Sequence, residues 1–300
     1  MSKLELLNQK YGLEGKLVFR QREDGFIYAD VTAPDAKAQI FLYGAHLVSF
    51  TPQGEEEVLW LSAISDFAPG KAIRGGVPVC FPWFGPAPFD RNLPKHGFAR
   101  LMEWNMVESK LLANGDVQLL MSLESSDESY FFWPFEFKLV MTFVIGRRLE
   151  AALSVKNTGA TQMQYSGALH TYFNVGDAAS VSVEGLSGHY FYPNGSTERQ
   201  VQRDPFFALD GFVDRCYVQH QQPCLIHDSA LDRTIVADKK GSRVTVLWNP
   251  WEESTRLIPD IADDGYRNFV CVEAANNFDD TIVLHPGETH QTAIMLGIQH

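Results

Sequence analysis

The chain has 300 residues, 45% of them hydrophobic, and this length and composition allow a large buried core. No run of about 18 apolar residues occurs, so the sequence predicts no membrane-spanning helix. The net charge of −12, from 25 Lys and Arg against 37 Asp and Glu, argues against a broad surface for nucleic acid or an anionic membrane. We therefore expect a protein that acts on a small molecule. As a separate expectation, which these properties do not settle, the protein is a monomer.

The N-terminus and the cysteines indicate where such a protein would act. Charged residues interrupt the apolar ones over Met1–Leu6, which argues against a signal peptide. The four cysteines form no C-x-x-C pair and are too few to brace a chain of this size. We expect reduced thiols and a cytoplasmic location.

In chain order, the first predicted element is a short helix that Ser2 caps and Gly12 ends, so that it runs through Tyr11. A second helical turn is expected over Asp127–Trp133, before Pro134. No other segment has a strong helical pattern.

Alternating apolar and polar residues dominate the remainder and predict β-strands separated by Gly, Asn, Asp and Pro. Hairpin turns are expected at Asn114–Asp116 and Gly146–Arg148. Many strands, few helices and no linker predict an all-β protein, one large antiparallel β-sandwich over residues 1–300. The strands are expected at Lys16–Gln21, Phe26–Thr32, Ala38–Tyr43, Val58–Leu61, Val117–Leu123, Phe137–Phe143, Leu149–Val155, Arg243–Trp248, Phe269–Ala274 and Gln291–Leu296.

Positive charge concentrates in the segment from Lys71 to Arg100, where only Asp90 opposes it. The segment includes a rigid stretch, Arg74–Pro86, with three Gly and three Pro, and Arg74 at its head can bind an anion with two hydrogen bonds. The alternative is a structural loop in which the arginine donates hydrogen bonds to backbone carbonyls.

A second stretch begins with Lys95 and His96 and ends with Arg100, just before a strand expected near Leu101. It suits an anion or sugar hydroxyls, or is a solvated turn.

Two strand residues are candidates for chemistry. His170 shares a face with Ala168 and Tyr172, although an isolated histidine is more often structural. Glu273 follows Val272 in a very apolar strand, where a carboxylate is costly to bury unless it is paired or used. Its structural alternative is a carboxylate bonded to backbone donors or to an arginine.

A histidine with a glutamate is typical of general acid–base catalysis. A metal site is less well supported, because neither H-E-x-x-H nor H-x-H occurs. The G-x-S-x-G motif of serine hydrolases is also missing. A glycosidase would need a second carboxylate in surroundings like those of Glu273.

The motifs RGGVPVCFPWFGP, HGFAR, ALHTYFNVGD, Asp214-Arg215 and VCVEAA occur in this order between residues 74 and 275. Together they resemble the D-hexose-6-phosphate mutarotases, the glucose-6-phosphate 1-epimerase branch of the aldose 1-epimerase superfamily. The resemblance runs from about Gly44 to the end of the chain.

The resemblance implies a galactose-mutarotase-like supersandwich that interconverts the anomers of a hexose 6-phosphate without a cofactor or metal. It implies His170 as general acid and Glu273 as general base. If the two lie close together, their charges should raise the pKa of His170 and lower that of Glu273. The implied substrate-binding residues are Arg74, Lys95, His96, Arg100 and Asp214, with Arg74 and Arg100 on the phosphate. Lys95 stands where relatives often carry Gln or another polar residue.

Two alternatives remain at this stage. One is an epimerase for unphosphorylated aldoses, which the cations of residues 71–100 disfavour. The other is a sugar-phosphate-binding module without activity, which the presence of both His170 and Glu273 disfavours.

Overall fold

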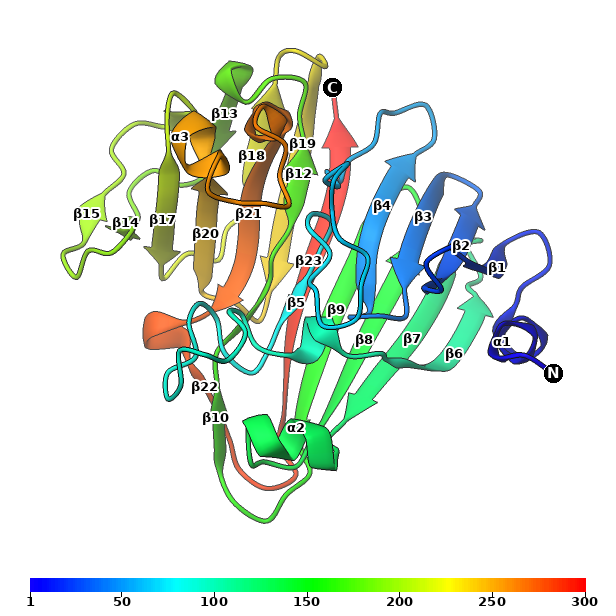
Figure 1. Cartoon of the computed structure of the whole chain (residues 1–300). Helices are drawn as coiled ribbons and strands as arrows, with labels where there is room; N and C mark the ends of the chain where they lie inside the picture. The colour runs from blue at the N-terminus through cyan, green and yellow to red at the C-terminus, as the bar shows by residue number, and fades with distance from the viewer.

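The computed structural model describes all 300 residues and confirms an antiparallel all-β architecture (Figure 1). A nine-stranded sheet is the largest unit, and its long central strands alternate buried and partly exposed residues as predicted. Its strand order is β16 (Phe206–Ala208), β13 (Val181–Glu184), β18 (Cys224–Asp228), β19 (Arg233–Lys240), β23 (Thr289–Gln299), β9 (Leu149–Asn157), β8 (Phe137–Ile145), β7 (Val117–Glu124) and β6 (Asn105–Leu111).

Two further sheets pack against this large sheet. The eight-stranded sheet has the order β15 (Gln200–Val201), β14 (Tyr190–Pro193), β17 (Val213–Val218), β20 (Val244–Asn249), β21 (Phe269–Asn276), β11 (Gly167–Leu169) and β5 (Val79–Cys80), and β12 (Tyr172–Asn174) also pairs with β21. The four-stranded sheet has the order β1 (Leu17–Gln21), β2 (Ile27–Ala33), β3 (Ala36–Phe41) and β4 (His46–Pro52).

The contacts between sheets define the layers. Strands β2 and β3 contact β7 and β8, whereas β11 and β21 contact β23. The two smaller sheets therefore lie side by side on one face of the nine-stranded sheet, as Figure 1 shows. One core cluster of 62 buried residues includes residues from Leu7 to Leu296. This is what a single domain would have, and the single domain stays a prediction.

The helices are short and peripheral. Helix α1 (Lys3–Tyr11) has the predicted cap, with the Ser2 hydroxyl accepting from the Glu5 amide. Helices α2 (Asp127–Phe132) and α3 (Trp251–Thr255), four 3₁₀ turns and the small β10 (Met163–Tyr165)–β22 (Ile282–Leu284) sheet complete the fold. None of the helices has the length and apolar character that a membrane crossing requires.

Two predicted strands are wrong. Residues Val58–Leu61 make only isolated bridges, through Leu59 and Leu61, because this segment crosses between sheets rather than joining one. The strand expected near Leu101 begins instead at Asn105, after a 3₁₀ turn over Ala99–Leu101.

Candidate active site

The glycines after Arg74 bring a loop against the strands that carry the candidate residues. Gly76 has φ of 62°, and a Cβ there would lie 2.2 Å from the Leu47 carbonyl oxygen, so only glycine fits. The Gly76 carbonyl accepts from the Tyr172 amide, and the Pro78 carbonyl accepts from the His170 amide. This loop therefore fixes the chain at His170, which lies between β11 and β12.

His170 and Glu273 meet on the face of the eight-stranded sheet that points away from the main core. Val272 and Ala274 belong to that core, whereas Cys271 packs with a separate cluster on the same face as Glu273. The Nε2 atom of His170 lies 3.3 Å from Oε1 of Glu273. Both residues are buried, with 7% and 2% exposure, so bulk water does not screen the pair.

The remaining polar atoms of the pair have no partner in the protein. Both Nδ1 of His170 and Oε2 of Glu273 are buried without a hydrogen bond. Structural polar groups in a core are almost always paired, so the structural alternative for Glu273, bonding to backbone donors or to an arginine, does not hold. Unpaired polar atoms in a buried pair are atoms with which a ligand can form hydrogen bonds.

The expected pKa shifts of the pair are wrong in sign. Burial, then the neighbouring His96, Arg100 and Arg74, lower the pKa of His170 well below its ordinary value. Burial, then the charge of Asp214, raises the pKa of Glu273 well above its ordinary value. Desolvation disfavours both charged forms and outweighs their mutual attraction, so the ligand-free site favours neutral side chains.

His96 lies edge-on to His170, with ring centroids 5.5 Å apart. Its Nδ1 accepts from the Gly85 amide at 3.2 Å, and burial lowers its pKa well below the ordinary value. A neutral imidazole that accepts at Nδ1 carries its proton on Nε2. His96 is thus a hydrogen-bond donor. Its φ of 62° is a backbone strain of a kind that is concentrated at functional sites.

A pocket of about 360 Å³ is lined by the side chains that the sequence singled out for an anion. Arg74 donates from Nε to Asp260 and from Nη1 to the Tyr172 hydroxyl, at 3.1 and 3.0 Å. Arg100 donates from Nη2 to the Lys95 carbonyl, and its buried Nε has no partner. The four cations among the lining residues are Lys71, Arg74, Lys95 and Arg100. This surplus of positive charge suits an anionic ligand.

The structure brings the last predicted residue, Asp214, to the same region. It lies on β17, burial raises its pKa, and the nearby Lys95 opposes that shift. Sequence reasoning missed Asp260, whose Oδ1 is buried without a partner on the wall of the pocket. Asp260 is 186 residues from Arg74 and follows no strand pattern, so no local signal could identify it.

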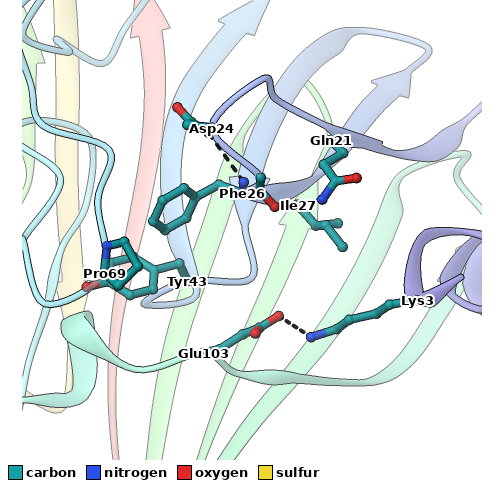
Figure 2. Close-up of a pocket in the computed structure, with 9 residues that line it drawn as sticks. Lys3, Gln21, Asp24, Phe26, Ile27, Tyr43, Pro69 and Glu103 are labelled. Carbon is teal, nitrogen blue, oxygen red and sulfur yellow. Dashed lines mark hydrogen bonds and ion pairs between the residues drawn. The ribbon is translucent and has the colours of Figure 1, made fainter.

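A larger cavity of about 470 Å³ lies elsewhere, between α1 and the four-stranded sheet (Figure 2). Its polar side chains already have partners. Lys3 pairs with Glu103, Asp24 accepts from the Phe26 amide, and Gln21 donates to the Gly25 carbonyl. Its size therefore does not make it the reactive centre, because it offers no unpaired polar group.

An antiparallel supersandwich with a buried His–Glu pair beside a cation-lined pocket defines a mutarotase-like protein. The sequence pattern of the aldose 1-epimerase family matches residues 30–296, and the chain belongs to this family.

Relatives and a solved structure agree with this assignment. A provisionally named glucose-6-phosphate 1-epimerase of Escherichia coli (strain K12) is 41% identical over 85% of each chain. One from Cenchrus ciliaris is 33% identical over 86% of this chain and 80% of its own. The crystal structure of a provisionally assigned mutarotase from Salmonella typhimurium matches with a TM-score of 0.89 and 36% identity. That match covers 96% of this chain and 95% of the other.

Proposed function

We propose that this chain interconverts the α- and β-anomers of a hexose 6-phosphate, with glucose 6-phosphate as the first candidate. The observation that carries the proposal is the 3.3 Å approach of His170 Nε2 and Glu273 Oε1 beside the cation-lined pocket. In a cyclic sugar, the ring oxygen and the anomeric hydroxyl are bonded to the same carbon. An acid and a base that serve these two oxygens must therefore lie close together.

In the proposed reaction, a proton first passes from the neutral Glu273 carboxyl to the His170 imidazole across their 3.3 Å contact. The resulting Glu273 carboxylate takes the proton of the anomeric hydroxyl, and the C1–O5 bond breaks. The electron pair stays on O5, which takes a proton from the His170 imidazolium, and an open aldehyde results. Rotation about C1–C2 presents the other face of the carbonyl. The two residues then reverse their roles, and each proton transfer contributes about 10²–10⁴-fold.

The phosphate has a second role in this proposal. The positive charges of Arg74 and Arg100 lower the pKa of His170 in the ligand-free site. A bound phosphate of charge about −2 offsets these charges, so the pKa of His170 rises toward the protonated form that the reaction needs. The phosphorylated substrate thereby promotes the active protonation state of the acid.

Exchange spectroscopy by NMR tests the proposal directly. We expect the protein to accelerate exchange between the anomers of glucose 6-phosphate, and to accelerate exchange of free glucose less. Faster exchange on glucose than on its 6-phosphate would make the enzyme an epimerase of unphosphorylated sugars. No acceleration on the 6-phosphates of glucose, galactose or mannose would leave a sugar-phosphate-binding module.

The phosphate contact has its own test in Arg74→Ala. We expect KM for glucose 6-phosphate to rise at least tenfold more than KM for glucose, because a guanidinium binds a phosphate with two hydrogen bonds. The control is Arg20→Ala, which removes an exposed arginine that also pairs with an aspartate, Asp30, outside the pocket. Equal losses on the two substrates would remove Arg74 from the phosphate site.

A further inference from the structure

Tyr172 connects the cation-lined pocket to the candidate acid. Its side chain is 1% exposed, and its hydroxyl accepts a hydrogen bond from Arg74 Nη1 at 3.0 Å. Arg74 has one other side-chain partner, Asp260, on its Nε. The guanidinium is thus fixed from two sides, by a carboxylate at the pocket wall and by a phenol from the interior.

The other end of the contact is the ring of Tyr172. It stacks on the His170 imidazole with centroids 4.8 Å apart and an interplanar angle of 9°. Trp60 stacks on the same tyrosine at 5.8 Å and Phe269 packs beside it at 5.3 Å, so the tyrosine ring itself has little freedom. Since close-packed aromatic rings restrict each other, the plane of the tyrosine sets the plane of the imidazole.

We propose that Tyr172 is a positioning residue that aligns the phosphate-binding Arg74 and the general acid His170 as one unit. The proposal rests on the function proposed above. The hydroxyl orients the guanidinium toward the phosphate, and the ring orients the imidazole toward the ring oxygen of the sugar. A hydroxyl and a ring with separate tasks predict separate kinetic effects, which a purely structural tyrosine would not produce.

The hydroxyl is tested with Tyr172→Phe, which keeps the stacked ring. We expect KM for glucose 6-phosphate to rise about tenfold, as for the loss of one hydrogen bond to a charged group, with kcat changed less than threefold. The effect on kcat/KM should be at least five times larger on the 6-phosphate than on glucose. Equal effects on both substrates, or none on either, would overturn the proposal.

The ring is tested with Tyr172→Leu, which removes the stack together with the hydroxyl. Here we expect kcat to fall at least tenfold on both substrates, because the imidazole loses its fixed plane. A kcat like that of Tyr172→Phe would show that the stack does not position His170. The matched control is Tyr165→Phe, at another buried tyrosine, whose hydroxyl bonds His290 at 2.9 Å. It should change kcat/KM less than twofold on either substrate.

A double-mutant cycle tests whether the hydroxyl acts through Arg74. In the Arg74→Ala background, Tyr172→Phe should change KM for glucose 6-phosphate less than twofold, because the partner of the hydroxyl is gone. A full tenfold effect in that background would contradict the proposal.

Binding of glucitol 6-phosphate, which has no anomeric centre, separates this inference from the proposed function. Calorimetry should give about tenfold weaker binding to Tyr172→Phe than to the unmodified protein, whether or not the protein accelerates anomer exchange. Equal affinities would overturn the role of Tyr172 even in an active epimerase. Failed exchange with an intact affinity difference would overturn the reaction, and with it the role of Tyr172 toward the acid, and would retain only its positioning of Arg74.

Discussion

Two groups of buried polar side chains include residues on the neighbouring strands β20 and β21, Thr245 and Glu273, yet their hydrogen bonding differs. One is the pair of His170 and Glu273, with two unpaired polar atoms. The other, the Lys239 cluster, comprises His220, Lys239, Ser242 and Thr245. In it, both ring nitrogens of His220 have partners, Thr245 Oγ1 at 2.8 Å and the Gly185 carbonyl at 2.9 Å. Lys239 donates to Ser242 and to the Val244 carbonyl.

Burial perturbs both groups in the same direction. It lowers the pKa of His220 to about 4 and that of Lys239 to about 7, just as it lowers the pKa of His170. A shifted pKa therefore does not tell a reactive group from a structural one in this protein. Hydrogen bonding is the better guide, because four of the seven buried side-chain atoms that lack a partner belong to the site residues Arg100, His170, Asp260 and Glu273. The comparison predicts large effects on activity at one group and large effects on stability at the other.

The largest effect is expected at Glu273. Replacement by Gln keeps the shape and removes the base, so kcat should fall about 10²–10⁴-fold. The free energy of unfolding should not fall, because the change removes a buried carboxyl group whose Oε2 has no partner. Anomer exchange and urea unfolding measure the two quantities on the same preparation. A near-normal kcat would refute Glu273 as the base, and a large loss of stability would place it among structural groups.

The second effect is the pH dependence of stability that His220 contributes. Its pKa is about 4 in the folded chain, against an ordinary value of 6.5. The folded state therefore binds the proton less readily, so the contribution is fully present above pH 6.5 and is lost as pH falls toward 4. At 1.36 kcal/mol per unit, the loss is roughly 3 kcal/mol.

Urea unfolding between pH 7 and 4 measures this contribution. The variant His220→Gln should flatten the pH dependence by roughly that amount. The control is His285→Asn, which replaces an exposed histidine outside the Lys239 cluster. If the free energy of unfolding of His220→Gln falls with pH as steeply as that of the unmodified protein, the Lys239 cluster accommodates the protonated His220.

The contrast also explains what the sequence could and could not predict. The strands of the nine-stranded sheet were predictable because alternation over Phe137–Ile145 reports a sheet with one buried face. Glu273 stood out because a carboxylate in so apolar a strand is rare. The strand predicted at Val58–Leu61 was wrong, because an apolar run indicates that a segment is buried and not that it pairs with a neighbouring strand.

The electrostatics of the site were not predictable from the sequence. Proximity of His170 and Glu273 suggested an ion pair, but the sign of the shifts depends on how completely both are buried. The partnership of Arg74 with Asp260 joins residues that no local pattern relates. Such information exists only once the sheets have packed.

The smallest effect comes from two threonines that line one small cavity of about 10 Å³. Both are buried, but Thr245 bonds His220, whereas the hydroxyl of Thr171 has no partner. Thr245→Val should lower the free energy of unfolding by about 1–2 kcal/mol, because it leaves a buried ring nitrogen unpaired. Thr171→Val removes only an unpaired hydroxyl and should cost less than about 0.5 kcal/mol or stabilise the fold.

Urea denaturation at pH 7.5, where His220 is neutral, compares the free energies of unfolding of the two variants. Equal losses would show that pairing does not separate stabilising polar groups from unused ones here. Because the Thr245 hydroxyl bonds within the structural cluster, its loss should change kcat less than twofold, the reverse of the pattern expected at Glu273.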